Sequence, residues 1–235
     1  GYEGLFQLTN ELMKAHYYQL KERTNKRRSG GLSAAYLNTH LQALQKFSDY
    51  LRQSGRLQLA KLDLQNEEDH QEITDILTQQ EIKSLFEITY IQYEQKKQDK
   101  GIVHYEALQL RDRAMLTVFY SCGLRRNEAY HLDTSDILFE RSVVHVRKAK
   151  GYKERFVPVT ATSLKHLQNY LYDARPYFVK DKCEAFLVTQ TGRRLSGQAM
   201  LIRLKQLIQL TNNTELQNKD IHLHTLRHSI ATHLL

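Results

Sequence analysis

Apolar residues recur at three- and four-residue intervals over much of the chain, which is the spacing of one face of an α-helix. Residues 5–22 show it first, with Leu12 and Tyr17 on the apolar side. A second helix is predicted between Ser33, a suitable N-cap, and Gly55, a suitable C-terminal residue. These two helices predict a small α-helical domain over residues 1–60.

The pattern is interrupted after residue 60 and then resumes. Thr78 and Glu81 form a predicted capping box at the start of a third helix, and Gly123 is the predicted end of a helix over 105–120. Alternating residues at 142–147 and 155–159 predict a β-hairpin with Lys150-Gly151 at or beside its turn. Further helices are predicted over 160–173, 196–210 and 225–235. The predicted fold is mainly α with a small antiparallel β-sheet, in two domains.

The charge pattern supports that division. Residues 1–60 carry a net charge of +5, residues 61–77 of −5 and residues 78–235 of +8. We therefore assign 61–77 to an acidic interdomain linker and 78–235 to a second domain. The overall charge of +8 and pI near 9.3 favour a polyanionic partner. Arg23, Lys26, Arg27 and Arg28 are candidate DNA-phosphate contacts in the first domain.

Composition narrows the cellular setting. Cys122 and Cys183 are isolated and lack a short metal-binding spacing, which favours reduced thiols in a cytoplasmic protein. No apolar stretch is long enough to predict a membrane span or a secretory signal. His224 and His228 could form one edge of a metal site with His222 or His233, but no neighbouring Cys or carboxylate completes a ligand set. No metal is predicted.

Two arginine motifs carry the chemistry. Cys122-Gly123-Leu124-Arg125-Arg126-Asn127-Glu128 lies about a hundred residues before His224-Thr225-Leu226-Arg227-His228. Displacement at a phosphodiester develops negative charge on the non-bridging oxygens, which two guanidinium groups can bind from two sides. Arg125 and Arg227 are the predicted phosphate clamp. A lysine on a turn can protonate the leaving oxygen, and Lys150 is the best candidate. Lys148 and Lys153 are its rivals for this role, and otherwise contact phosphates.

With the intervening Lys-Ala-Lys-Gly-Tyr-Lys-Glu-Arg segment, these motifs resemble the tyrosine recombinase (phage integrase) family in residues and in order. The resemblance covers about residues 32–235. It implies a helical core-binding domain followed by a catalytic domain, with Arg125, Lys150, His224 and Arg227 as catalytic residues. Glu128 and His228 would support the site. Arg126 stands where the family often has an aliphatic residue, so we assign it to DNA contact.

The resemblance also implies a reaction. The family cuts and rejoins double-stranded DNA through a 3′-phosphotyrosyl intermediate, without metal or nucleotide cofactor, as a tetramer on two recombining sites. All 14 tyrosines precede His224, whereas the family's nucleophile follows that motif. We therefore expect the nucleophile beyond Leu235, and expect this chain to be inactive in cleavage. A type IB topoisomerase-like enzyme and a non-catalytic DNA-binding fragment remain the alternatives.

Overall fold

The computed structural model describes residues 7–26, 29–55, 57, 59–68, 76–94, 102–147, 154–179 and 182–234. Its contacts divide the chain into two compact units, Gly1–Glu72 and Ile73–Leu235. Both units are mainly helical, and an antiparallel sheet lies in the second, which confirms the predicted fold class. In the described ranges no helix is long and apolar enough to cross a lipid bilayer.

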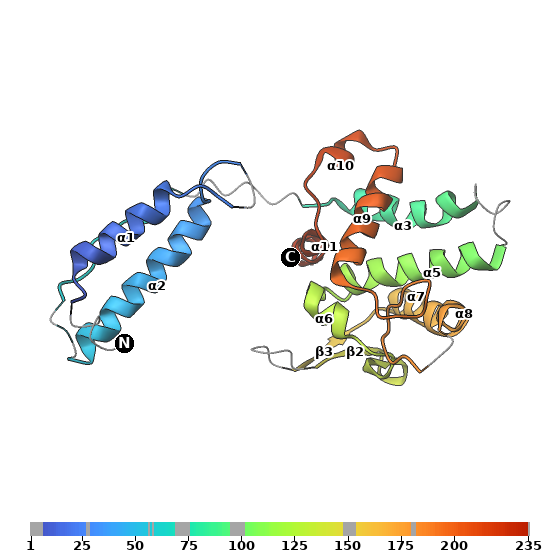
Figure 1. Cartoon of the computed structure of the whole chain (residues 1–235). Helices are drawn as coiled ribbons and strands as arrows, with labels where there is room; N and C mark the ends of the chain where they lie inside the picture. Colours follow the sequence, from blue (N-terminus) through green and yellow to red (C-terminus); the bar gives the residue numbers. More distant parts are fainter. Residues whose placement is uncertain are drawn as a thin grey trace. The chain divides into compact units, whose positions relative to one another are not determined.

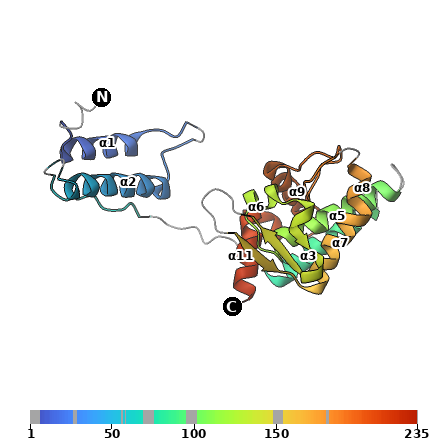
Figure 2. The same cartoon turned by 90° about the horizontal axis from the view of Figure 1, so that it is seen from below.

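The first unit is built on two helices that lie side by side, α1 (Asn10–Glu22) and α2 (Ala34–Gln53) (Figures 1 and 2). Ser33 caps α2 as predicted, since its Oγ accepts a hydrogen bond from the Tyr36 amide at 3.3 Å. The predicted start of the first helix at residue 5 is wrong at residues 7–9. Thr9 accepts a hydrogen bond from the Leu12 amide and so fixes the helix start at Asn10.

Part of the acidic segment lies against these two helices. The side chain of Asn38 donates to the carbonyl of Glu67 at 2.9 Å and accepts from its amide at 2.7 Å. Lys21 forms an ion pair with the Glu67 carboxylate at 2.8 Å, and Leu62 is buried. Residues 61–68 therefore pack on the first unit, while the second half of the predicted linker, 69–75, lies outside the described residues.

The second unit surrounds its core with helices and a small sheet. Its described helices are α3 (Gln79–Glu94), α5 (Ile102–Phe119), α6 (Arg126–His131), α7 (Ala161–Asn169), α8 (Arg175–Phe178), α9 (Gly197–Leu210), α10 (Thr214–Asn218) and α11 (Leu223–His233). Short 3₁₀ segments (Thr134–Asp136, Phe139–Arg141) flank β1 (Ile137–Leu138), and a π-helical turn (Tyr170–Ala174) joins α7 to α8. The sheet order is β1-β2-β3, all antiparallel, with β2 (Val143–Val146) and β3 (Arg155–Pro158) forming the predicted hairpin.

Two local signals explain where the helices around the site begin and end. Thr78 and Glu81 make both hydrogen bonds of the predicted capping box, at 3.2 and 2.7 Å, and start α3 at Gln79. Gly123 has a φ of +57°, a left-handed conformation that glycine adopts without steric cost. It turns the chain between α5 and α6, which Figure 1 shows next to each other.

The core of this unit is continuous and holds α5 at its centre. Met115 and Phe119 of α5 are fully buried together with Tyr170 and Phe186. Leu226 of α11 belongs to the same cluster. Because α6 and α11 both pack on α5 or its neighbours, the two motif segments are held in a fixed relation to one another.

Candidate active site

The first motif places an arginine and a carboxylate at the start of α6. Arg125 is the N-cap residue, and its backbone amide donates to Glu128 Oε2 at 2.8 Å. Its guanidinium also donates to Glu128 Oε1, at 3.1 Å. The carboxylate therefore caps the helix and orients the Arg125 side chain, which is 38% exposed.

Arg155, the first residue of β3, completes the environment of Glu128. Its two terminal nitrogens donate to the two carboxylate oxygens at 2.8 Å each, a bidentate pair. The Glu128 side chain is only 2% exposed. Burial acts to raise the pKa of Glu128, but the hydrogen bonds from Arg155 and Arg125 outweigh it and lower the pKa to about 2. Glu128 is thus ionised and cannot serve as a general acid at neutral pH.

The second motif brings Arg227 to the same carboxylate. Arg227 lies on α11, and its Nη1 donates to the carbonyl of Gly123 and is 4.0 Å from Glu128 Oε2. Burial and then the charge of Arg125 lower the pKa of Arg227. The structure therefore gathers the two predicted clamp arginines around one buried carboxylate. With Arg155 they outnumber its charge by two, an arrangement suited to an anion.

The histidines of the second motif stand beside the arginines. His224 and His228 are one helical turn apart on α11, exposed, and their rings meet edge to face with centroids 4.2 Å apart. Burial, His228, Arg227 and Arg125 lower the pKa of His224, in that order of effect. A neutral imidazole beside two guanidinium groups can accept a proton at neutral pH.

The remaining histidines of this region have other partners. His222 is paired with Asp220 at 3.1 Å, and His233 with the hydroxyl of Tyr120 at 3.0 Å. Among the residues that the structure describes, no three His, Cys, Asp or Glu side chains are grouped so that they could hold a metal ion.

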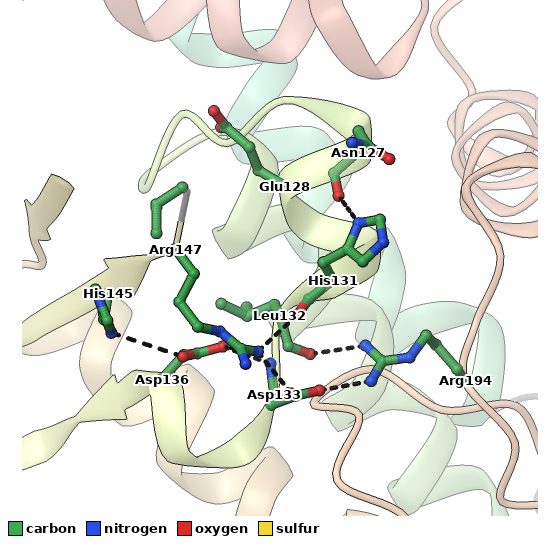
Figure 3. Close-up of a pocket in the computed structure, with 10 residues that line it drawn as sticks. Asn127, Glu128, His131, Leu132, Asp133, Asp136, His145, Arg147 and Arg194 are labelled. Atoms are coloured by element: carbon green, nitrogen blue, oxygen red, sulfur yellow. Dashed lines mark hydrogen bonds and ion pairs between the residues drawn. The ribbon is translucent and has the colours of Figure 1, made fainter. Parts of the chain in front are cut away.

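Arginine–carboxylate hydrogen bonds hold both strands of the hairpin to the rest of the unit. Arg147, the residue after β2, donates to Asp133 Oδ2 at 2.5 Å and to Asp136 Oδ2 at 2.8 Å (Figure 3). Arg155 holds the opposite strand to Glu128. The predicted Lys148, Lys150 and Lys153 come between these two arginines in the sequence and lie outside the described residues.

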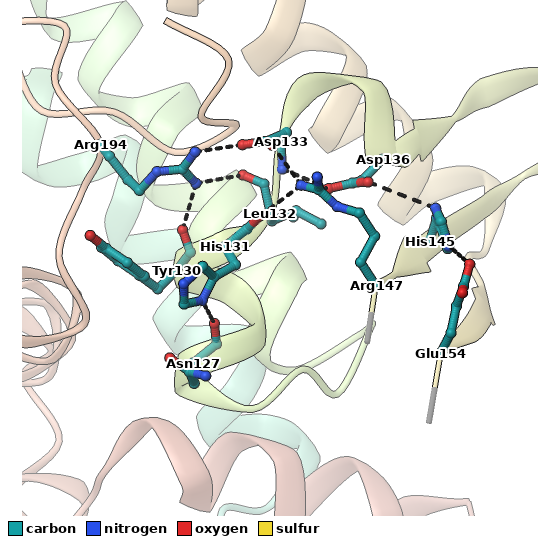
Figure 4. A network of polar contacts seen from close by, with 10 residues as sticks. All are labelled: Asn127, Tyr130, His131, Leu132, Asp133, Asp136, His145, Arg147, Glu154 and Arg194. Atoms are coloured by element: carbon teal, nitrogen blue, oxygen red, sulfur yellow. Dashed lines mark hydrogen bonds and ion pairs between the residues drawn. The ribbon is translucent and has the colours of Figure 1, made fainter. Parts of the chain in front are cut away.

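Figure 4 shows the polar network behind this attachment. Arg194 donates to the Tyr130 carbonyl at 2.7 Å and to Asp133 Oδ1 at 2.6 Å, so Asp133 joins two arginines. Desolvation opposes the change, but the hydrogen bonds from Arg194 and Arg147 lower the pKa of Asp133. Asp136 Oδ2 accepts from Arg147 and from the Asp133 amide, which ties the end of α6 to β2.

Sequence reasoning missed the roles of Arg155 and Arg147. Both arginines flank the lysine-rich turn, and their symmetric placement around it was the signal that could have identified them. In the first unit, the predicted contacts Arg23 and Lys26 are exposed after the end of α1. Arg27 and Arg28 lie outside the described residues.

Comparisons with known proteins cover the segment that holds this site. The model of the phage integrase family matches residues 75–235, which contain every element of the site. The chain belongs to the phage integrase family. A tyrosine recombinase XerD of Oceanobacillus iheyensis is 33% identical over 208 residues, covering 87% of this chain and 64% of that protein. A XerC of Natranaerobius thermophilus is 35% identical over 131 residues, covering 54% and 42%. The chain thus spans less than two thirds of these relatives.

Solved structures of the phage integrase family share the fold. The Tn1549 transposon integrase, solved in complex with circular intermediate DNA, aligns with a TM-score of 0.68 at 20% identity, covering 97% of this chain and 72% of that one. A lambda integrase dimer bound to a COC′ core site aligns with a TM-score of 0.58 at 12% identity, covering 97% and 71%. At these identities the similarity establishes the fold alone.

Proposed function

We propose that this chain is the DNA-binding and phosphate-activating part of a tyrosine-type site-specific recombinase. The observation that carries the proposal is the convergence of Arg125 and Arg227, from two distant motifs, on the buried Glu128. The carboxylate orients the arginines while leaving them in charge excess, which is what a phosphodiester transition state requires. Membership of the phage integrase family and the histidine beside the clamp support the same reaction class.

In the proposed reaction a tyrosine hydroxyl, supplied from outside these 235 residues, attacks phosphorus. A bond forms between the phenolic oxygen and phosphorus, and the bond from phosphorus to the deoxyribose 5′ oxygen breaks. His224 takes the phenolic proton and Lys150 gives a proton to the leaving 5′ oxygen. Arg125 and Arg227 bind the non-bridging oxygens as charge develops on them. Rejoining is the reverse of these steps with a new 5′ hydroxyl.

The proposal extends to the assembly. The two basic segments, before and after the acidic one, would contact the same duplex, and the complete enzyme would act as a homo-tetramer on two paired sites. Glu128 and His228 act in it as supporting residues, and Arg23, Lys26, Arg27, Arg28, Arg126, Lys148 and Lys153 as DNA contacts. The solved complex of the Tn1549 integrase with DNA and the net positive charge of both segments support the proposed DNA contact.

Binding of the 235-residue chain to duplex DNA should weaken steeply with salt. Each phosphate neutralised by a lysine or arginine releases counterions, so the logarithm of the affinity falls by about 0.9 per contact for each unit of log salt. We expect about five or more contacts, measured by fluorescence anisotropy of a labelled duplex over a series of NaCl concentrations. Glutamine at both Arg23 and Lys26 should lower the slope by about two. An affinity that does not change with salt would contradict the proposed DNA binding.

A further inference from the structure

Arg126 differs from the arginines around it. It is the first residue of α6, directly after Arg125, and its side chain is exposed. Arg125, Arg155 and Arg194 all bind carboxylates. The side chain of Arg126, by contrast, makes no hydrogen bond or ion pair with any other residue in the described ranges. Its charge is therefore available to an outside anion next to the proposed phosphate clamp.

The stem of Arg126 lies across Gly197, the first residue of α9. A Cβ atom built on Gly197 would lie 2.8 Å from Cγ and 2.9 Å from Cδ of Arg126, closer than real Cβ contacts. The third nearest atom, at 3.5 Å, is Nε of the same side chain. A methyl group at position 197 would therefore displace Arg126 and, among the near neighbours, Arg126 alone.

The backbone gives no other reason for glycine at this position. Gly197 is not among the glycines with positive φ, and α9 is already capped by Ser196, whose Oγ accepts from the Ala199 amide at 3.1 Å. Glycine is a poorer helix former than alanine because its unfolded backbone has more freedom to lose. The close contact with Arg126 is therefore the structural feature that accounts for glycine at position 197.

Helix α6 and the segment before α9 cannot easily move apart to admit a larger residue. Arg194, two residues before the α9 cap, donates to the Tyr130 carbonyl of α6 and to Asp133 just beyond it, as Figure 4 shows. Leu195 is buried and its amide donates to Leu187. Because α6 and α9 are joined in this way, a larger residue at position 197 would displace the side chain of Arg126.

We propose that Gly197 is a positioning residue for DNA binding. By leaving room for the stem of Arg126, it holds the guanidinium ready for a DNA phosphate next to the one that Arg125 and Arg227 bind. This inference rests on the proposed function, because it takes duplex DNA as the anion. It adds a residue that touches no DNA itself and acts through Arg126.

A double-mutant cycle tests the proposal with the 235-residue chain. Wild type, Arg126→Ala, Gly197→Ala and the double variant are titrated against one labelled mixed-sequence duplex at several NaCl concentrations. Arg126→Ala should weaken binding about threefold to tenfold and lower the salt slope by about one. Gly197→Ala should also weaken binding and lower the salt slope, to an equal or smaller extent. The double variant should bind DNA no more weakly than Arg126→Ala. Gln198→Ala, the exposed neighbour, should bind like wild type.

Thermal unfolding distinguishes a positioning role of Gly197 from a general loss of stability. Alanine at a helical position stabilises, so the Tm of Gly197→Ala should be unchanged or higher by about 2–4 °C while its affinity falls. A lower Tm that Arg126→Ala restores would also support the contact. Wild-type affinity for Gly197→Ala, additive losses in the double variant, or a lower Tm that Arg126→Ala does not restore would overturn the proposal. Failure of the wild-type chain to bind DNA would instead contradict the proposed function.

Discussion

Arg227→Lys in the product of the whole gene should lower the rate of DNA cleavage by about a hundredfold or more. Lysine keeps the charge but lacks the planar fork that can bind a phosphate oxygen and the Gly123 carbonyl together. Binding should stay within about threefold of wild type, because many other phosphate contacts remain. The rate is measured in single-turnover cleavage of a labelled duplex, with binding measured in parallel.

A matched control is Arg193→Lys, an exposed arginine on the turn before α9 that lies outside the site. It should cleave at close to the wild-type rate. Near-normal cleavage by the Arg227→Lys enzyme would contradict the assignment of Arg227 to the phosphate clamp. Equal losses in both variants would show that the experiment reports general DNA binding.

Glu128→Gln should lower the free energy of unfolding of the 235-residue chain by about 3 kcal/mol at neutral pH. The amide fills the same volume, but it leaves Arg125, Arg155 and Arg227 close together without a counter-charge. Part of that repulsion is screened by water, since the arginine side chains are about a third exposed. Urea unfolding followed by circular dichroism measures the difference.

The same carboxylate gives the stability a defined pH dependence. The pKa of Glu128 is lowered to about 2 in the folded chain, from an ordinary value of 4.5. Its contribution should therefore be fully present above about pH 4.5 and be lost as the pH falls towards 2. Glu128→Gln should lack this part of the pH dependence. Glu140→Gln, at an exposed carboxylate, should keep it and should change stability by less than about 0.5 kcal/mol. Identical behaviour of the two variants would contradict the structural role of Glu128.

The fold was predictable where local signals determine it. Ser33, Thr78 and Glu81 begin helices through hydrogen bonds within four residues, and the hairpin follows from alternation around a Lys-Gly turn. Where a competing local cap was overlooked, as at Thr9, the boundary was misplaced. The π-helical turn at Tyr170–Ala174 was not anticipated, because buried helical residues show the same apolar spacing with or without it.

The site was predictable only in part, for a physical reason. The motifs name Arg125 and Arg227, but nothing in their spacing shows that Glu128 would be shared with Arg155 of β3. Such a pairing depends on tertiary packing between α6 and the hairpin. The same holds for Gly197, whose contact with Arg126 joins residues far apart in the sequence.

The most direct test of the central claim is to trap a covalent protein–DNA adduct on a nicked, end-labelled duplex. On a denaturing gel, the product of the whole gene should give a slower band with the protein joined to the 3′ phosphate, leaving a free 5′ hydroxyl. The 235-residue chain should give no such band, because arginines, a lysine and histidines stabilise the transition state but do not form the phosphotyrosine. A covalent band from the 235-residue chain that maps to a tyrosine before His224, or no band from the product of the whole gene, would contradict the account.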